Sequence, residues 1–175
     1  QGGNYTITGS KTDDYLNGVN TLDLVMMQRH ILDIEKIKTP YQLVAADVNK
    51  DKKITAGDLV ELRKLILGVD AKLKNNESWR FVDKGFTFPD PANAQAANLK
   101  ESYEIYDLSS DMAVDFVGVK VGDVNNSVVA HLNANQSENR SSKQVNLVVE
   151  NKQFKAGDLV TVNVSTENET ELYGM

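Results

Sequence analysis

The sequence predicts an α+β fold: a central pair of helices, each preceded by a loop, with an aromatic cover, a closing strand, and β-strand segments at both ends. The segments TLDLVMMQRHIL and AGDLVELRKLIL place apolar side chains at helical spacing. Aligning Asp23 with Asp58 superimposes the two segments at an offset of 35 residues. Apolar residues that alternate with polar ones near both ends predict the strands. Of the 175 residues, 41% are hydrophobic, which is enough for a core.

Each element has a local signal. Tyr5 and Ile7 alternate with threonines in a first strand. Pro40 stands in the first turn of a short helix, where its missing N–H costs nothing, and Gly68 ends the second long helix. In chain order we expect a strand in 1–12, helices at 21–34, 40–46 and 56–68, an irregular aromatic segment at 75–112, and strands at 114–121, 145–150 and 159–164.

Composition and motifs argue against several function classes. The chain has 19 basic and 25 acidic side chains, a balance that disfavours nucleic-acid binding. The absence of cysteine excludes thiol catalysis and cysteine-ligated zinc. No motif for nucleophilic, zinc or nucleotide chemistry is present, and His30 and His131 are expected to be a packed and a solvated histidine. We therefore expect a protein that is not an enzyme.

The loop before the second helix has the pattern of a calcium site. Residues 47–58, DVNKDKKITAGD, place oxygen donors at alternating positions of a 12-residue loop, and calcium takes six to eight oxygen ligands. Two positions depart from the EF-hand pattern: Lys52 replaces the glycine of position 6, and Asp58 replaces the glutamate of position 12. A solvated turn that caps the helix through Asp58 is the alternative. The expected ligands are the side chains of Asp47, Asn49, Asp51, Thr55 and Asp58 and the backbone carbonyl of Lys53.

The first repeat lacks the front half of such a loop. Its positions 1, 3 and 5 are Thr12, Asp14 and Leu16, a poor ligand set. The segment GDVNNS at 122–127, however, is the opening of a calcium loop with no helix after it. We therefore expect a second, split calcium site. Its front half consists of Asp123, Asn125 and Ser127, and its back half of the Gly18 carbonyl, Asn20 and Asp23.

Two alternatives to this split site stay open. Asp13, Asp14 and Asn17 could replace the distal fragment or add to it. The GDVNN segment could also do no more than turn the chain after a strand.

These residues resemble a family. DVNKDKKITAGDLVELRKLILG looks like the calcium loop and helix of a type I dockerin repeat, and TLDLVMMQRHIL resembles the first helix of the variant found in large secreted bacterial surface proteins. The resemblance extends over residues 13–127 and implies calcium binding and docking onto cohesin modules. The hydroxyl pair that dockerins usually carry at loop positions 10 and 11 is replaced here by Ala56–Gly57 and Thr21–Leu22.

The ends of the chain resemble β modules. GGNYTIT is similar to the last strand of an immunoglobulin-like module, and the segment from VNLVVE onward resembles the opening strands of a cohesin-like β-sandwich. We therefore expect the terminal strand of a preceding β module at 1–12, a dockerin-like calcium-binding domain at 13–127, a polar linker at 128–144, and the first strands of an incomplete β-sandwich at 145–175.

The resulting functional prediction is a non-catalytic, extracellular or cell-surface calcium-binding module for protein–protein or inter-module attachment. Its partner is expected to be a cohesin-like or other β-sandwich module, or copies of itself, and no segment is apolar enough to span a membrane. One alternative is a self-assembling surface filament or adhesin subunit that polymerises through its β ends. Another is an accessory region of a secreted carbohydrate-active enzyme.

Overall fold

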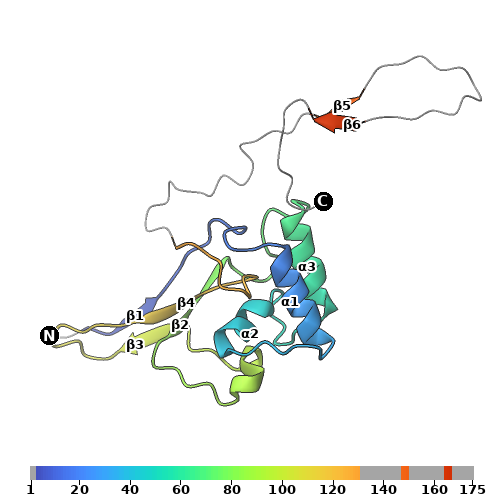
Figure 1. The fold of residues 1–175 in the computed structure, drawn as a ribbon. Coiled ribbons are helices and arrows are strands. Elements are labelled where there is room, and N and C mark those ends of the chain that lie inside the picture. The colour runs from blue at the N-terminus through green and yellow to red at the C-terminus, as the bar shows by residue number, and fades with distance from the viewer. Residues whose placement is uncertain (1–2, 131–146, 150–163, 167–175) are drawn as a thin grey trace, which may run out of the picture. The chain divides into compact units, whose positions relative to one another are not determined.

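The structure, a computed structural model, describes residues 3–130, 147–149 and 164–166 of the chain (Figure 1). Both helices and strands form, so the predicted α+β class is confirmed. The chain divides into two compact units, residues 1–137 and 138–175. The boundary falls inside the polar segment that we expected to be a linker.

The two long helices form where the repeat predicts them. They are α1 (Thr21–Ile31) and α3 (Ala56–Ile66), and α2 (Pro40–Ala46) lies between them in the sequence. Each long helix begins at a capping box, formed by Asn20 with Asp23 in α1 and by Thr55 with Asp58 in α3. Gly68 follows α3 with a positive φ of 69°, as expected for a helix stop.

The first helix is shorter than the predicted range 21–34. Asp33 has a positive φ of 59° at the position equivalent to Gly68, so the chain leaves α1 by the same left-handed turn that follows α3. Asp33 tolerates that conformation better than most residues because its short polar side chain hydrogen-bonds locally. The apolar residue after it, Ile34, is exposed and does not extend the helix.

The segment 75–112 is more regular than we predicted. It contains β2 (Trp79–Asp83), a 3-10 helix η1 (Pro91–Ala96) and β3 (Ser102–Ile105). β2 pairs antiparallel with β4 (Phe116–Lys120), the closing strand expected at 114–121. The strand pattern in β2 is hidden because Arg80 takes a buried position, where it forms an ion pair with Glu101 at 2.8 Å.

The N-terminal strand β1 (Tyr5–Thr8) forms as predicted, but its partner lies within the same unit. It pairs antiparallel with β3, and the register places Tyr5 opposite Ile105. Gly9, just after β1, approaches Phe81 so closely that an added Cβ would lie 2.5 Å from its ring. The structure thus places β1 in the first unit, together with β3.

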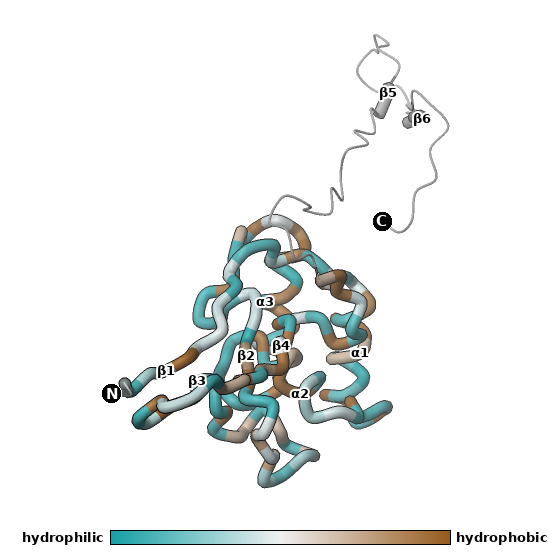
Figure 2. The backbone as a smooth tube through the Cα atoms, turned by 90° about the vertical axis from the view of Figure 1, so that its left-hand side faces the viewer, coloured by the Kyte–Doolittle hydropathy of each residue, from teal (hydrophilic) through white to brown (hydrophobic). Residues whose placement is uncertain are grey.

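The core of the first unit lies between the helices and the β2–β4 pair (Figure 2). Val82 of β2 belongs to it, whereas the adjacent Trp79 and Phe81 alternate to the other side of the strand. The aromatic cover comes instead from Phe86 and Phe88, which pack partly buried against the core. The fully buried members of the core include Val19, Met27, Leu43, Val44, Val48, Leu62, Val121 and Val124.

In the second unit, β5 (Leu147–Val149) pairs antiparallel with β6 (Val164–Thr166). The strand predicted at 145–150 is thus present in its described part. The strand predicted at 159–164 lies outside the described residues except for Val164, and His131 also lies outside them.

Candidate metal centre

The front of the contiguous loop is organised by a buried aspartate at the end of α2. Asp47 is fully buried and caps α2, and its two carboxylate oxygens accept hydrogen bonds from the backbone N–H groups of Asp51 and Lys52, both at 3.0 Å. Asn49 Oδ1 accepts a second bond from the Asp51 N–H at 2.9 Å. These bonds curl residues 47–52 into a tight loop that brings alternating side chains to its inside.

The back of the same loop closes on a second buried aspartate. Asp58 lies in the first turn of α3 and is fully buried. Its Oδ1 accepts the N–H of Asn49 at 3.1 Å and its Oδ2 the N–H of Thr55 at 2.8 Å. The side chain of Thr55 accepts the N–H of Gly57 at 3.1 Å, and Asp51 Oδ1 accepts the N–H of Lys53 at 2.9 Å. These hydrogen bonds link the six predicted ligand residues of this loop into one network.

Two lysines pay a conformational cost for this shape. Lys50 and Lys52, at loop positions 4 and 6, have positive φ values of 62° and 69°. A residue with a Cβ is disfavoured in this region by about 1–2 kcal/mol. The strain expected from the departure at position 6 is therefore present in the backbone.

The fragments predicted to form the split site meet in space and repeat the same hydrogen bonds. Asp123 Oδ1 accepts the N–H of Ser127 at 3.0 Å, and its Oδ2 accepts the N–H of Val128 at 2.8 Å, as Asp47 does for Asp51 and Lys52. Asp23 Oδ1 accepts the N–H of Asn125 at 3.0 Å, as Asp58 does for Asn49. Two fragments about 100 residues apart in sequence thus share the pattern of one loop.

Further details of the split loop match the contiguous one. Asn125 Oδ1 accepts the N–H of Ser127 at 2.9 Å, and Asp23 Oδ2 accepts the N–H of Asn20 at 2.8 Å. Asn126 has a positive φ of 57° at the position equivalent to Lys50. The Ser127 hydroxyl donates a hydrogen bond to the Gly18 carbonyl at 2.8 Å. One expected ligand of the front half is therefore already in contact with one of the back half.

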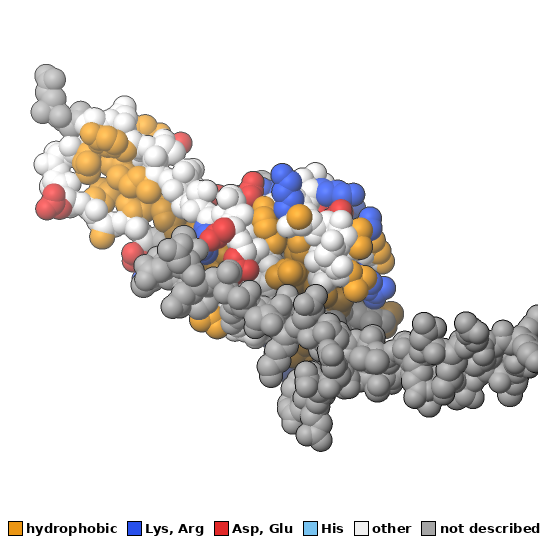
Figure 3. Space-filling view, turned by 90° about the horizontal axis from the view of Figure 1, so that it is seen from above, with side chains coloured by type: hydrophobic (Ala, Val, Ile, Leu, Met, Phe, Trp, Pro, Cys, Tyr) orange, Lys and Arg blue, Asp and Glu red, His pale blue; other side chains and the backbone are white. Residues whose placement is uncertain are grey.

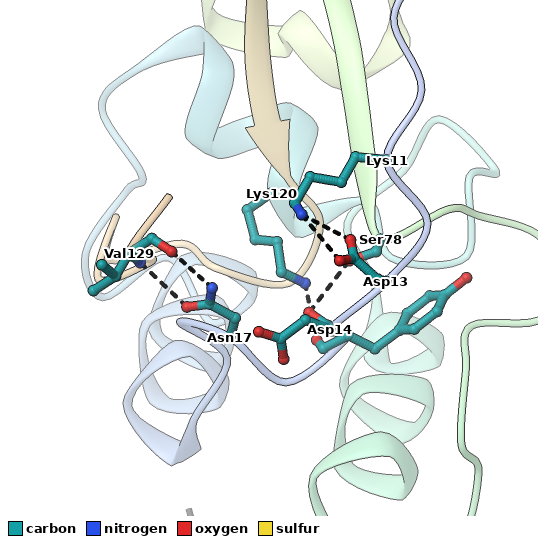
Figure 4. A network of polar contacts seen from close by, with 8 residues as sticks. Lys11, Asp13, Asp14, Asn17, Ser78, Lys120 and Val129 are labelled. Atoms are coloured by element: carbon teal, nitrogen blue, oxygen red, sulfur yellow. Dashed lines mark hydrogen bonds and ion pairs between the residues drawn. The ribbon is translucent and has the colours of Figure 1, made fainter. Parts of the chain in front are cut away.

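Two of the three alternative ligands near the N-terminus, Asp13 and Asn17, are engaged elsewhere. Asp13 is exposed and forms an ion pair with Lys11 at 2.8 Å. The Asn17 carboxamide forms two hydrogen bonds with the backbone of Val129. Figure 4 shows these contacts, with Asp13 and Asn17 in separate parts of the network. In this arrangement Asp13 and Asn17 do not take the place of the Asp123 fragment.

In each loop, two negatively charged aspartates are buried close to one another. Asp47, Asp58, Asp23 and Asp123 are at most 2% exposed, and no described cation forms an ion pair with any of them. Burial raises the pKa of Asp47 to about 6 against the opposing hydrogen bond from Lys52, and the nearby charge of Asp58 adds to the rise. Burial also raises the pKa of Asp23, with a smaller contribution from Asp123. A bound cation would relieve this repulsion in both loops.

The donor chemistry indicates which kind of cation fits. Among the described residues, no three His, Cys, Asp or Glu side chains group together as a metal site. The expected ligands of each loop are two or three carboxylates, which the structure does not bring together as a group of three, with amide, hydroxyl and carbonyl oxygens. Such all-oxygen sets of mixed charge suit calcium, whereas structural zinc is bound by sulfur and nitrogen.

The comparison with protein families agrees with this chemistry. Residues 17–67 match the model of the dockerin type I domain. This part of the chain is dockerin-like. The match begins at Asn17, where the back half of the first loop begins, and ends at Leu67 after α3. Comparison with curated proteins and with solved structures gives no match.

The dockerin assignment fixes the cofactor and the general class of activity. Type I dockerins bind calcium in EF-hand-like loops, and calcium is therefore the cofactor of this domain. Dockerins are non-catalytic modules that bind cohesin partners and occur in extracellular or cell-surface proteins. Among the described residues, no helix is long and apolar enough to cross a membrane.

Two residues that support the loops carried no sequence signal. The buried Asn76 donates its Nδ2 to the backbone carbonyl of Asp47 at 3.1 Å. Gln42 of α2 donates its Nε2 to the carbonyl of Val124 at 2.8 Å, between two expected ligands of the split site. Both side chains bond to backbone atoms, and a hydrogen bond to the backbone leaves no residue pattern in the sequence. Only the fold reveals these contacts.

Proposed function

We propose that the chain is a calcium-dependent attachment module of an extracellular or cell-surface protein and that its dockerin domain binds two calcium ions. The observation that carries the proposal is the repeated hydrogen-bond pattern around two pairs of buried aspartates, Asp47 with Asp58 and Asp123 with Asp23. Calcium supplies the positive charge that these pairs lack within the described residues.

In the contiguous site, the ion is held by one stretch of chain. The side chains of Asp47, Asn49 and Asp51 come from the front of the loop, the carbonyl of Lys53 from its middle, and Thr55 and Asp58 from the start of α3. Three carboxylates against one divalent ion give this site a negative surplus.

In the split site, the ion joins two distant parts of the chain. Asp123, Asn125 and Ser127 follow β4, while the Gly18 carbonyl, Asn20 and Asp23 lead into α1. Calcium there closes a loop of about 100 residues, and its binding free energy adds to the stability of the folded domain. The dockerin helices and the β2–β4 pair are thereby fastened into one unit.

Thermal unfolding in calcium and in a chelator tests this proposal. A ligand that binds only the folded state at 100 times its Kd stabilises that state by about 2.7 kcal/mol per site. Two such sites raise the midpoint by more than about 10 °C in a domain of this size. An unchanged midpoint contradicts calcium binding as the basis of the fold's stability.

The partner that fits best is a β-sandwich module of the cohesin type. α1 and α3 with their C-cap residues expose apolar side chains at equivalent positions, Val25 with Val60 and Leu32 with Leu67, each about half exposed or more. Because the usual hydroxyl pair is missing, we infer that apolar contacts on these helices carry the docking. Such a pair of exposed faces on one helical unit is what a flat sheet of a partner can cover.

Binding to a panel of cohesin modules in calcium and in a chelator tests the partner proposal. The double variant Val25→Arg, Val60→Arg is expected to lose binding and to keep its calcium stoichiometry. Met112→Arg, at an equally exposed apolar residue outside the helices, is the matched control and is expected to bind normally. Equal binding by all three proteins contradicts docking through α1 and α3.

A second candidate function is assembly through the β segments. β1 is exposed along its whole length, and its two-stranded ribbon with β3 carries Tyr5 and Ile7 on one face. Figure 3 shows hydrophobic side chains gathered in a patch at one end of the described part of the first unit. Size-exclusion chromatography with light scattering tests this: filament assembly predicts large species that a chelator weakens, and a monomer at high concentration contradicts it. A role as an accessory region of a carbohydrate-active enzyme stays a prediction.

A further inference from the structure

The split loop has a break at one defined position. In the contiguous loop, Lys52 joins the front half, which ends in Asp51, to the back half, which starts at Lys53. Its N–H donates to Asp47, but its side chain is not among the expected ligands. The peptide chain itself therefore fixes the distance between the two halves of that site.

In the split loop, two different residues occupy the equivalent position. Val128 ends the front half, and its N–H donates to Asp123 Oδ2 at 2.8 Å, as Lys52 does to Asp47. Asn17 directly precedes Gly18, the first ligand of the back half, as Lys52 directly precedes Lys53. No covalent bond connects the two halves here, so another interaction has to keep them in register.

The Asn17 carboxamide spans this break. Its Nδ2 donates to the carbonyl of Val129 at 2.8 Å, and its Oδ1 accepts the N–H of Val129 at 3.2 Å, across 112 residues of sequence. Asn17 is only 4% exposed, so water competes little for these bonds. A carboxamide presents one donor and one acceptor side by side, and in Figure 4 it faces the Val129 backbone as a neighbouring strand would.

We propose that Asn17 is a positioning residue for the split calcium site, acting as a non-covalent splice that replaces the missing peptide link between its two halves. This inference rests on the proposed split site. Both polar atoms of the Asn17 side chain are used by Val129, and the equivalent Lys52 side chain contributes no ligand. A change of affinity on substitution of Asn17 therefore reports the placement of the ligands and not the loss of one.

Other hydrogen bonds between the two halves join Ser127 to Gly18 and Asn20, and Val124 and Asn125 to Asp23, and each of them involves a residue that we assign as a ligand. The Ser127 hydroxyl bond to Gly18 joins two groups that we assign as ligands, so calcium competes with it. The hydrogen bond from Gln42 holds Val124, near the start of the front half, and does not restrain the other end of the front half at Ser127. Asn17 instead holds the chain just after Ser127, the last ligand of the front half. In the contiguous loop, the peptide chain itself makes this connection.

Four variants test the splice by competitive calcium titration that resolves both sites. Asn17→Ala removes both hydrogen bonds, and Val129→Pro removes the Val129 N–H from the same contact. Val129→Ala, the matched control, keeps the backbone groups and changes only a side chain that is 46% exposed. The fourth variant combines Asn17→Ala with Val129→Pro. Loss of a group that orients metal ligands typically weakens affinity 10- to 100-fold.

We expect Asn17→Ala and Val129→Pro each to weaken the split site about 10-fold. The contiguous site and the Val129→Ala control are expected to stay within about twofold of wild type, and the double variant to be little weaker than either single one, because both changes break one contact. If Asn17→Ala does not fold, Val129→Pro still reports, since Val129 lies at the surface.

The outcomes separate this inference from the proposed site. A wild-type stoichiometry of one ion overturns the split site itself. Two ions in the wild type with unchanged affinities in the variants overturn only the splice. Equal weakening of both sites also overturns it, because a general loss of stability explains that result.

Discussion

Replacement of Asp123 by asparagine removes one charge from the split site while keeping the size of the side chain. In the metal-free protein, Asp123 accepts the N–H groups of Ser127 and Val128 with separate oxygens, and asparagine has only one oxygen. A buried N–H without a partner costs about 1–3 kcal/mol, and this loss appears with or without calcium. In calcium the variant also loses the contribution of the split site, about 2.7 kcal/mol at 100 times the Kd.

Thermal unfolding in calcium and in a chelator separates the two effects. The difference between the two midpoints is expected to shrink by about 10 °C in Asp123→Asn relative to wild type. Asp13→Asn, at an exposed aspartate paired with Lys11, is the matched control and should keep the full calcium-dependent difference. Asp47→Asn should lose the contribution of the contiguous site. A calcium-dependent difference in Asp123→Asn equal to that of wild type would refute the role of Asp123 as a ligand.

Three further predictions follow from the geometry. Lys52→Gly should raise the midpoint in chelator, by about 1 kcal/mol of stability, because it relieves the positive φ, whereas Lys53→Gly should bring no gain; equal effects in a melting experiment would contradict this. Gly9→Ala should destabilise the domain by about 1–3 kcal/mol through contact with Phe81, and more than Gly118→Ala, whose Cβ would lie 3.4 Å from the Trp79 ring; chemical denaturation checks the order. The contiguous site, with three carboxylates against two, should bind calcium more tightly than the split one, and two resolved affinities in the reverse order would count against the assignment.

The parts of the fold that the sequence predicts are those encoded locally. The apolar spacing and the capping residues of α1 and α3 lie within each helix, and the ligands of the contiguous loop lie within 12 residues. For such a loop the spacing of residues largely determines the geometry. The helices and the grouping of the contiguous site's residues could therefore be predicted from the residues alone.

The β pairs could not be predicted because their signals are distributed over distant segments. Arg80 breaks the apolar alternation of β2, and the Glu101 that neutralises it comes 21 residues later. The partner of β1 is β3, which lies nearly 100 residues further along the chain. Pairing at that distance depends on how the intervening elements pack.

The split site stands between these cases. Asp123 and Asn125 keep the order of a calcium loop, so their type of site is visible in the sequence, but their partners are not adjacent to them. The sequence singles out Asn17 only as a possible ligand; its contact with Val129 could not be predicted, because it is made to backbone atoms and any residue could stand there. Only the packed structure shows that the two ends of the loop meet.

The most direct test of the account is the number of calcium ions bound per chain, measured by calorimetric titration of the protein after removal of metal. We expect two ions, the first at the contiguous loop and the second, bound more weakly, at the site that joins Asp123 to Asp23. A stoichiometry of one would contradict the split site, and no binding would contradict the calcium-dependent module as a whole.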